Sequence, residues 1–485
     1  MDIRFLLVPV FLPIISGIAS FIIPFKKQKS HNLFIGISLL LSAASVWISA
    51  LFAGDGELVL LSFTDSLDFS LRLDGAGKIF ACLSATLWPL TALYAFDYMK
   101  HEKHLRSFYC FFVMSFGSVM GIAMASDMLT MYLFYELLTL FTIPLVMHGM
   151  EHKHKYATRK YMLYSIGGAS FAFAGVVYLI VNAADSFTFG GHIISPDDPT
   201  LSMVLFVFAF MGFGVKAAIF PFHGWLPTAS VAPTPVTALL HAVAVVKAGA
   251  FALIRLVYYS WGTGFIKGTP AHAVVMALCI FTILYGSVSA QKQPHFKRRL
   301  AYSTVSNLSY IAFAVTLMSQ AGLIAAFCHM IFHSVIKIGA FFCAGSVLHN
   351  SEEEYVNNLE GLGRKMPLTF GFYTVFALAL TGIPPLCGFF SKWYIALASI
   401  REGSFLAITG VVILLVSAFL TAVYMLSPAV KAFFPSREKE ISDFAKAKEA
   451  GAEMLIPIGV CAVASVLLGI FAQIPADIIK EVLGL

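Results

Sequence analysis

Charged residues are scarce in this sequence: Asp, Glu, Lys and Arg together make up 12% of its 485 residues. Soluble domains carry about 25%, because a water-facing surface needs charged side chains to cover it. Hydrophobic residues make up 59% of the chain, and 46 residues are Phe. This lack of charge excludes a soluble globular enzyme and predicts one all-α integral membrane protein.

Paired cysteines are also lacking. The seven cysteines lie far apart in apolar stretches, and none belongs to a CxxC pair or stands beside a cluster of histidines. This spacing excludes iron–sulfur ligation and a structural zinc site, so we expect no cofactor and no metal. The N-terminus has no basic segment before its apolar run, and that run is too long for a cleaved signal. We therefore expect it to be the first retained span.

Apolar runs of about 20 residues, the length that crosses a bilayer as a helix, recur along the chain. They predict fourteen transmembrane spans. In chain order these lie near residues 5–25, 32–53, 76–96, 108–125, 128–149, 161–182, 202–222, 233–258, 270–290, 299–319, 322–348, 368–398, 405–428 and 454–474.

Lys and Arg gather in alternate loops between these spans, as they do where basic loops face the cytoplasm. The loops after spans 1, 3, 5, 9, 11 and 13 are basic, and Lys26, Lys153 and Lys297 are examples. The loops after spans 2 and 6 are acidic and contain Glu57 and Asp185. We expect a multi-pass protein of a prokaryotic cell (inner) membrane with both termini outside. Because the net charge of +6 resides in these loops, it indicates membrane topology and no nucleic-acid partner.

A few charged residues fall inside the predicted spans. Each costs about 2.5–3.5 kcal/mol to place at the centre of a membrane helix, so a function is the default interpretation. Arg255 lies near the outer end of its span, and we expect its head group to reach the interface instead of joining a relay. Interface anchoring is the alternative for Lys216, and a neutral, hydrogen-bonded carboxyl is the alternative for Glu136. The set comprises Glu136, Lys216, Lys247, Arg255, Lys337 and Lys392.

Histidines extend this set. His329, His333 and Lys337 are spaced four apart and form one stripe on span 11. His241 precedes Lys247 by six residues on a different face of span 8. A lone buried His is usually a satisfied core residue, but a His, His, Lys stripe in lipid favours a proton relay. Metal binding by His329 and His333 is the alternative, and the sequence offers no third ligand.

Two spans contain helix breakers beside a lysine. Span 7 reads MGFGVKAAIFPFHGWLP, with Lys216 before Pro221, and span 12 reads ALALTGIPPLCGFFSKW, with Pro384 and Pro385 before Lys392. Proline frees backbone groups, which a membrane tolerates only where protein or water satisfies them. Broken helices at matching places predict two inverted five-helix repeats, spans 4–8 (108–258) and spans 9–13 (270–428). N-terminal helices (1–107) precede the repeats, and a loop with the final span (429–485) follows them.

Several long motifs occur in a fixed order: YELLTLFTIP, KAAIFPFHGWLPTASVAPTPVTALLHAVAVVKAGAF, KRRLAYSTVSNLSYI, HMIFHSVIKIGAFFCAGSVLH and GIPPLCGFFSKW. With them the chain resembles antiporter-like subunits of the complex I superfamily from about residue 70 to 430. That superfamily includes proton-pumping subunits of NADH-quinone oxidoreductase, large subunits of Mrp-type cation/proton antiporters, and membrane subunits of energy-converting hydrogenases. No long C-terminal helix follows span 14, which argues against the longest type of subunit.

The resemblance implies a role for most of the buried ionisable residues. Glu136 and Lys216 would form the acid and lysine pair and Lys247 the central relay lysine. His329, His333 and Lys337 would match the polar run of the second half, and Lys392 the terminal group. His241 is not part of this resemblance, but we expect it to lie on the path between Lys216 and Lys247. The sequence departs from the family pattern at His295, where the motif commonly has Asp. It also has Gly167 and Gly168 where some relatives have a buried acid.

The function that we expect is translocation of H⁺, or Na⁺/H⁺ antiport, by a non-redox membrane subunit within a larger complex. Burial favours a neutral lysine and a nearby carboxylate favours a charged one, so Lys216 should hold a proton while Glu136 is close and release it when the pair separates. The driving change would come from partner subunits. The alternatives are a stand-alone secondary transporter, a quinone-associated subunit of a redox enzyme, and a purely structural subunit.

Overall fold

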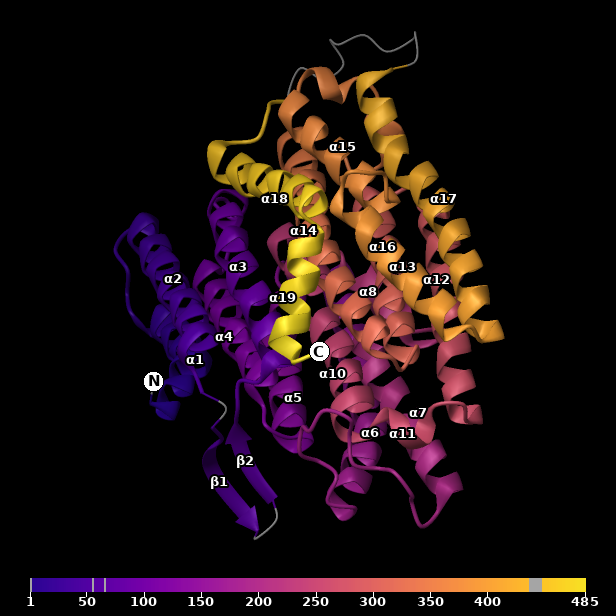
Figure 1. Cartoon of the computed structure of the whole chain (residues 1–485). Helices are drawn as coiled ribbons and strands as arrows, with labels where there is room; N and C mark the ends of the chain where they lie inside the picture. Colours follow the sequence, from indigo (N-terminus) through magenta and orange to yellow (C-terminus); the bar gives the residue numbers. More distant parts are fainter. Residues whose placement is uncertain (1, 55, 65–66, 436–446) are drawn as a thin grey trace.

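The computed structural model describes all residues except 1, 55, 65–66 and 436–446. Long helices run roughly side by side through the molecule, and one small hairpin of strands extends from one end of the bundle (Figure 1). Part of the basic loop after the thirteenth predicted span, residues 436–446, lies outside the described residues.

The N-terminal part contains a 3-10 turn, Ile3–Leu6, followed by α1 (Leu7–Ile22), α2 (Gln28–Phe52) and α3 (Gly75–Tyr98). The antiparallel strands β1 (Leu58–Thr64) and β2 (Leu67–Leu71) form the hairpin between α2 and α3. We did not expect strands, so the all-α prediction is wrong at this loop. The backbone of the hairpin is satisfied partly by the bundle, because Arg72 N donates to Met124 O over 2.7 Å.

The middle of the chain forms α4 (Leu105–Met124), α5 (Met128–Val146), α6 (His152–Val181) and α7 (Pro199–Lys216). After α7 come the short elements Phe222–Gly224 and α8 (Trp225–Ala229). The predicted eighth span is not one helix: α9 (Thr234–Ala242) and α10 (Val245–Arg255) are separate, and a π-helical turn, Leu256–Ser260, follows α10. The expected span is present as one apolar segment, Thr234–Ser260, but the break inside it was not expected.

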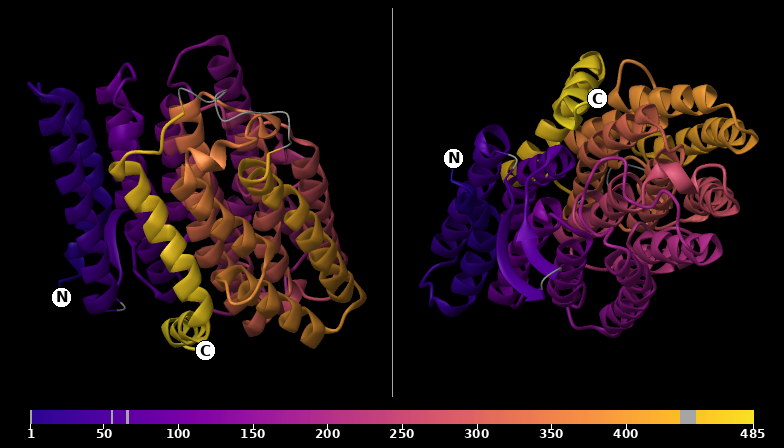
Figure 2. Two further views of the ribbon diagram at one scale, coloured as in Figure 1. Left: turned by 90° about the horizontal axis from the view of Figure 1, so that it is seen from above. Right: turned by 60° about the horizontal axis from the view of Figure 1, so that its bottom comes forward.

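The remaining helices are α11 (Thr263–Ile266), α12 (Pro270–Lys292), α13 (Phe296–Thr316), α14 (Gln320–Ser351), α15 (Pro367–Thr381), α16 (Cys387–Glu402), α17 (Phe405–Phe433), α18 (Ala452–Ile470) and α19 (Gln473–Leu483). Short 3-10 turns, Val356–Asn358 and Leu362–Arg364, lie between α14 and α15. The short α19, which we did not expect, is seen almost end-on below α18 in the left view of Figure 2, so it lies across the bundle axis.

Within the described residues, twelve helices are long and apolar enough to cross a membrane, against the fourteen spans expected. The two expected spans that do not qualify coincide with α13 and with the pair α15 and α16. α13 carries Lys297, Arg298 and Arg299 in its first turn, and α15 with 15 residues and α16 with 16 are the two halves of one interrupted span. The protein is a multi-pass helical membrane protein.

The helices alternate in direction, so the Lys- and Arg-rich loops lie together at one end of the bundle. We call this end the basic face. It contains the loops that join α1 to α2, α3 to α4, α5 to α6, α12 to α13 and α14 to α15. The hairpin lies at the opposite end (Figure 1).

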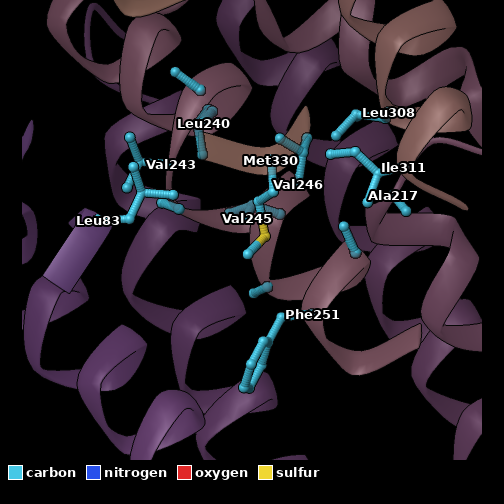
Figure 3. Packing of buried hydrophobic residues seen from close by; sticks show 14 of the residues in the cluster. Leu83, Ala217, Leu240, Val243, Val245, Val246, Phe251, Leu308, Ile311 and Met330 are labelled. Atoms are coloured by element: carbon cyan, nitrogen blue, oxygen red, sulfur yellow. The ribbon is translucent and has the colours of Figure 1, made fainter. Parts of the chain in front are cut away.

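The segment from α9 to the π-helical turn is the centre of the bundle, because the other helices cover it completely. Figure 3 shows Val245 and Val246 of α10 beside Met330 of α14, with Leu308 and Ile311 of α13 close by. Fully enclosed apolar packing leaves no lipid or bulk water next to this segment, so any polar group on it depends on protein partners or internal water.

Gly249 allows α10 to approach the end of α7 closely. A Cβ at this position would lie 2.5 Å from Ala217 N and 2.8 Å from Lys216 C. We expect Gly249→Ala to lower stability by about 1–3 kcal/mol because the added methyl overpacks this contact. The thermal unfolding midpoint of the purified protein in detergent measures the effect.

Gly371→Ala is the matched control, because a Cβ at Gly371 in α15 meets nothing within 4 Å. Its midpoint should be unchanged or slightly higher, since Ala favours a helix over Gly. Equal midpoints for the two variants would contradict the close contact between α10 and α7.

Candidate functional site

Glu136 and Lys216 meet where α5 passes the end of α7. Lys216 is the last residue of α7 and is 1% exposed, and its Nζ lies 3.3 Å from Glu136 Oε1. The ammonium also donates to Tyr135 O and lies 3.3 Å from the centroid of the Tyr135 ring. The Glu136 side chain is 26% exposed, so it is less deep than we expected. The lysine is thus enclosed by α5, while the carboxylate lies between the protein interior and the lateral surface.

Other parts of the protein form hydrogen bonds with the backbone groups at the helix break after Lys216. Trp225 Nε1 of α8 donates to Val215 O over 2.8 Å, and Phe220 N donates to Thr282 Oγ1 of α12 over 3.1 Å. Backbone groups freed by a break must be satisfied inside a membrane, and these contacts meet that need. These hydrogen bonds stabilise the interruption, which leaves Lys216 at a helix end deep in the bundle.

Lys247 lies just after the second, unexpected break. Val243 and Ala244 leave the helical path, and both of their N–H groups donate to Leu239 O. A hydrogen bond of 2.6 Å joins Lys247 Nζ to His333 Nδ1 of α14, and both side chains are almost fully buried. The structure thus brings together a lysine and a histidine that are 86 residues apart in the chain.

His241 lies on the other side of this break, at the end of α9. It is fully buried, and neither of its ring nitrogens has a hydrogen-bond partner within the described residues. Buried polar atoms are almost always hydrogen-bonded to protein or to ordered water. The ring packs against Phe341 of α14, with centroids 4.7 Å apart, and keeps both nitrogens free of protein partners within the described residues.

The stripe on α14 is continuous in space as it is in sequence. The rings of His329 and His333 are stacked with centroids 5.7 Å apart. Lys337 Nζ donates to Leu300 O over 3.0 Å and to Ser303 Oγ, both on α13. His329 Nδ1 lies 2.9 Å from Ser391 Oγ of α16. Nε2 of each histidine has no partner within the described residues, so the stripe has unused hydrogen-bonding capacity on both rings.

Lys392 is the last of these buried ionisable residues along the chain, and it lies at the second predicted break. It is 6% exposed, and its Nζ donates to Leu380 O over 2.7 Å and to Thr381 O over 2.9 Å. These are the last carbonyls of α15, which the break leaves without intrahelical partners. A cation at a helix C-terminus is also favoured by the helix dipole. Ser391, the preceding residue, connects Lys392 to His329.

The structure offers no support for metal binding at the histidines. No group of three or more His, Cys, Asp or Glu side chains that could hold a metal ion occurs among the residues described. His329 and His333 instead have Ser391 and Lys247 as their partners. Those two partners belong to other helices and were not identifiable as contacts from the sequence.

Arg255 does not reach the interface, and that expectation is wrong. Its side chain is fully buried, and its guanidinium forms two bonds of 2.5 and 2.6 Å to Asp74 at the start of α3. It also lies over the rings of Phe187, Phe251 and Tyr259. Burial raises the pKa of Asp74, but the Arg255 guanidinium and the Gly77 N–H together hold it below its ordinary value of 3.8. Arg255 is therefore a structural residue that ties α10 to α3.

The departures from the family pattern have local explanations. His295 Nδ1 accepts from Arg298 N, so this histidine caps the start of α13 as an Asp would. It also pairs with Glu354 Oε2 at 3.3 Å. A Cβ at Gly168 would lie 2.6 Å from Val215 Cβ, so α6 and α7 are too close there for an acidic side chain.

The fold and the site define a multi-pass membrane protein with a buried row of ionisable side chains. Residues 125–421, more than half of the chain, match the family described as NADH:quinone oxidoreductase/Mrp antiporter, TM. The chain belongs to this family, which confirms the resemblance found in the sequence.

The similar proteins include both a subunit of an NADH-quinone oxidoreductase and a subunit of an Na⁺/H⁺ antiporter. Over 408 residues the chain is 32% identical to NADH-quinone oxidoreductase subunit N of Desulforudis audaxviator, and the match covers 81% of this chain and 80% of that protein. It is 28% identical over 447 residues to Na⁺/H⁺ antiporter subunit A1 of Staphylococcus aureus, covering 86% of this chain but 54% of that protein. The chain thus spans about half the length of that relative.

A solved structure shares the whole fold. It is that of the membrane-bound sulfane sulfur reductase, an archaeal respiratory membrane complex. One chain of it matches with a TM-score of 0.86 and 22% identity, over 99% of this chain and 97% of that chain. The agreement extends the common fold beyond the matched family region to α1–α3 and to α18 and α19.

The buried ion pair of Arg255 gives a prediction for stability. Arg255→Met leaves the partly buried Asp74, whose side chain is 21% exposed, without its partner, which we expect to cost about 3 kcal/mol, the low end for a buried pair. Because the pKa of Asp74 is lowered in the folded protein, its contribution is present at pH 7 and disappears as the pH falls below its ordinary value. Thermal unfolding at pH 7 should show a large drop in midpoint.

Arg401→Met, at an exposed position near the end of α16, is the control and should leave the midpoint nearly unchanged. A midpoint for Arg255→Met that equals that of the control would show that the guanidinium contributes nothing to folding.

Proposed function

We propose that the chain is an ion-translocating subunit of a multisubunit membrane complex and that it moves protons along the row from Glu136 to Lys392. The observation that carries this proposal is the bond between Lys247 and His333, since it couples two titratable groups on different helices at the centre of the bundle. Intramembrane ionisable residues mark ion pathways and proton relays. The names of similar proteins, an NADH-quinone oxidoreductase subunit and an Na⁺/H⁺ antiporter subunit, support the same class of function.

The first step takes place at the lateral side of the row. Lys216 holds its proton while Glu136 is close and ionised, because a nearby carboxylate favours the charged amine. When the pair separates, desolvation favours the neutral amine and the proton leaves. Lys247 lies on the adjoining helix, because α10 packs against the end of α7 at Gly249, two residues after Lys247. Water near the unpaired nitrogens of His241 would complete this transfer.

The second step runs through α14. Lys247 passes a proton to His333, and the stacked ring of His329 and the hydroxyl of Ser391 lead on to Lys392. Lys337 is bonded to α13 and lies beside this line, where its charge alters the proton affinity of its neighbours. Each lysine is held by carbonyls or a single side chain, so a local shift is enough to change its charge state.

Vectorial transport needs access from one side at a time. We assign the two half-channels to the breaks near Pro221 and Pro384, within two inverted repeats over 108–258 and 270–428. We assign the basic face to the cytoplasm and both termini to the outside, because Lys and Arg gather in cytoplasmic loops. The energy comes from partner subunits, and the partly exposed Glu136 is the group of the row that a lateral neighbour reaches first.

The test is Lys247→Met in the assembled complex, assayed in membrane vesicles. Met keeps most of the volume and removes the titratable amine, so we expect proton translocation to fall at least about tenfold, as for loss of a proton-transfer group. Glu136→Gln should give the same direction of change. Repeating the assay with Na⁺ present or absent distinguishes proton pumping from Na⁺/H⁺ antiport.

Lys365→Met at the basic face is the control, since this lysine is exposed and outside the row. Complexes of each variant are first shown to assemble to the wild-type level. Wild-type translocation by an assembled Lys247→Met complex would exclude the relay.

A further inference from the structure

A cavity of about 460 Å³ lies at the basic face, well away from the relay. Its polar lining includes Tyr98 at the end of α3, His101, Lys103 and His104 in the following loop, His148 just after α5, and His349 near the end of α14. Its volume lies within the range of small-ligand sites. Neither the relay nor the fold makes use of this concentration of imidazoles.

The four histidines have unused hydrogen-bonding capacity. None of their side chains forms a hydrogen bond or ion pair in the described part of the chain. His148 is the most informative, because it is 8% exposed and Phe108 packs against its ring without bonding to it. Burial, with help from His104 and His154, lowers the pKa of His148 to about 4. Neither ring nitrogen of His148 is among the fully buried atoms without a partner, so this neutral imidazole keeps accessible nitrogens for an occupant of the cavity.

The charges around the cavity favour an anion. Lys103 lines it, Lys100 lies in the same loop and Arg106 lies in the first turn of α4. The acids nearby are the lining Glu102 and Glu354, which acts on Tyr98. The 20-residue helix α4 begins directly after His104, and no side chain caps its first N–H groups. Helix N-termini favour negative charge. A cation is disfavoured, because no group of three metal ligands occurs among the described residues.

The position of the cavity at the ends of the helices indicates which class of anion it would bind. It lies where the apolar helices α3, α5 and α14 end, and Met150, which also lines it, is 58% exposed. Basic pockets between membrane helices at this level bind phosphate-containing headgroups. Phosphate has several acceptor oxygens, which suit a ring of N–H and ammonium donors.

We propose that this cavity binds a phosphate group, carried by a lipid headgroup or free as inorganic phosphate. The bound phosphate connects the end of α14 with the loop between α3 and α4. Because α14 carries His329, His333 and Lys337, the occupant would hold the basic-face end of the helix that forms half of the relay.

The experiment measures binding to the purified, delipidated complex by native mass spectrometry and thermal shift. The probes are short-chain phosphatidylglycerol, inorganic phosphate, and a diacylglycerol of the same chain length that lacks phosphate. We expect Lys103→Gln to weaken phosphatidylglycerol or phosphate binding about fivefold and His148→Leu to weaken it about tenfold. Lys103 is exposed, so its variant does not endanger folding.

Lys155→Gln, an exposed lysine at the same face in α6, is the matched control and should bind as the wild type does. Competition by inorganic phosphate would identify a free anion as the ligand, and binding of phosphatidylglycerol alone would identify a lipid. Equal binding of diacylglycerol, equal binding by Lys103→Gln and wild type, or no binding of either phosphate probe would overturn the proposal. Because the readout is binding, its result is independent of the proton relay.

Discussion

The interaction on which the rest of the structure depends is the solvation of buried amines by protein. A lysine ammonium removed from water is unstable unless oxygen or nitrogen acceptors replace the lost water. Each relay lysine has such acceptors: Glu136 and a carbonyl for Lys216, His333 for Lys247, Leu300 O and Ser303 for Lys337, and the end of α15 for Lys392.

The helix breaks supply those acceptors and the positions of the amines. Lys216 ends α7, Lys247 begins the first turn of α10 after an interruption, and Lys392 bonds the free carbonyls of α15. An unbroken helix would consume the same carbonyls internally. The broken geometry therefore places ionisable groups at helix ends inside the bundle, where dipoles and free backbone groups influence their charge.

Arg255 shows that buried charge alone does not identify a relay. Its guanidinium is as deep as the lysines, yet Asp74 holds it with two short bonds and three aromatic rings enclose it. Arginine keeps its proton in proteins, and the two bonds to Asp74 fix the guanidinium in place, although its Nε has no partner within the described residues. The relay lysines differ because their partners are single side chains or carbonyls, with unpaired histidine nitrogens nearby.

The sequence by itself determined the membrane class, the alternation of basic and acidic loops, the buried ionisable residues from which we propose a relay, and the stripe on α14. These follow from local composition, from apolar runs of about 20 residues and from a spacing of four residues along a helix. None of them requires knowledge of distant contacts. It did not reveal the hairpin after α2, whose strands are short and amphipathic, or the break before Lys247, which contains neither Gly nor Pro. Only the tertiary structure decided that Lys247 bonds His333, that Arg255 bonds Asp74, and that four histidines from distant segments share one cavity, because each of these depends on how separate helices pack.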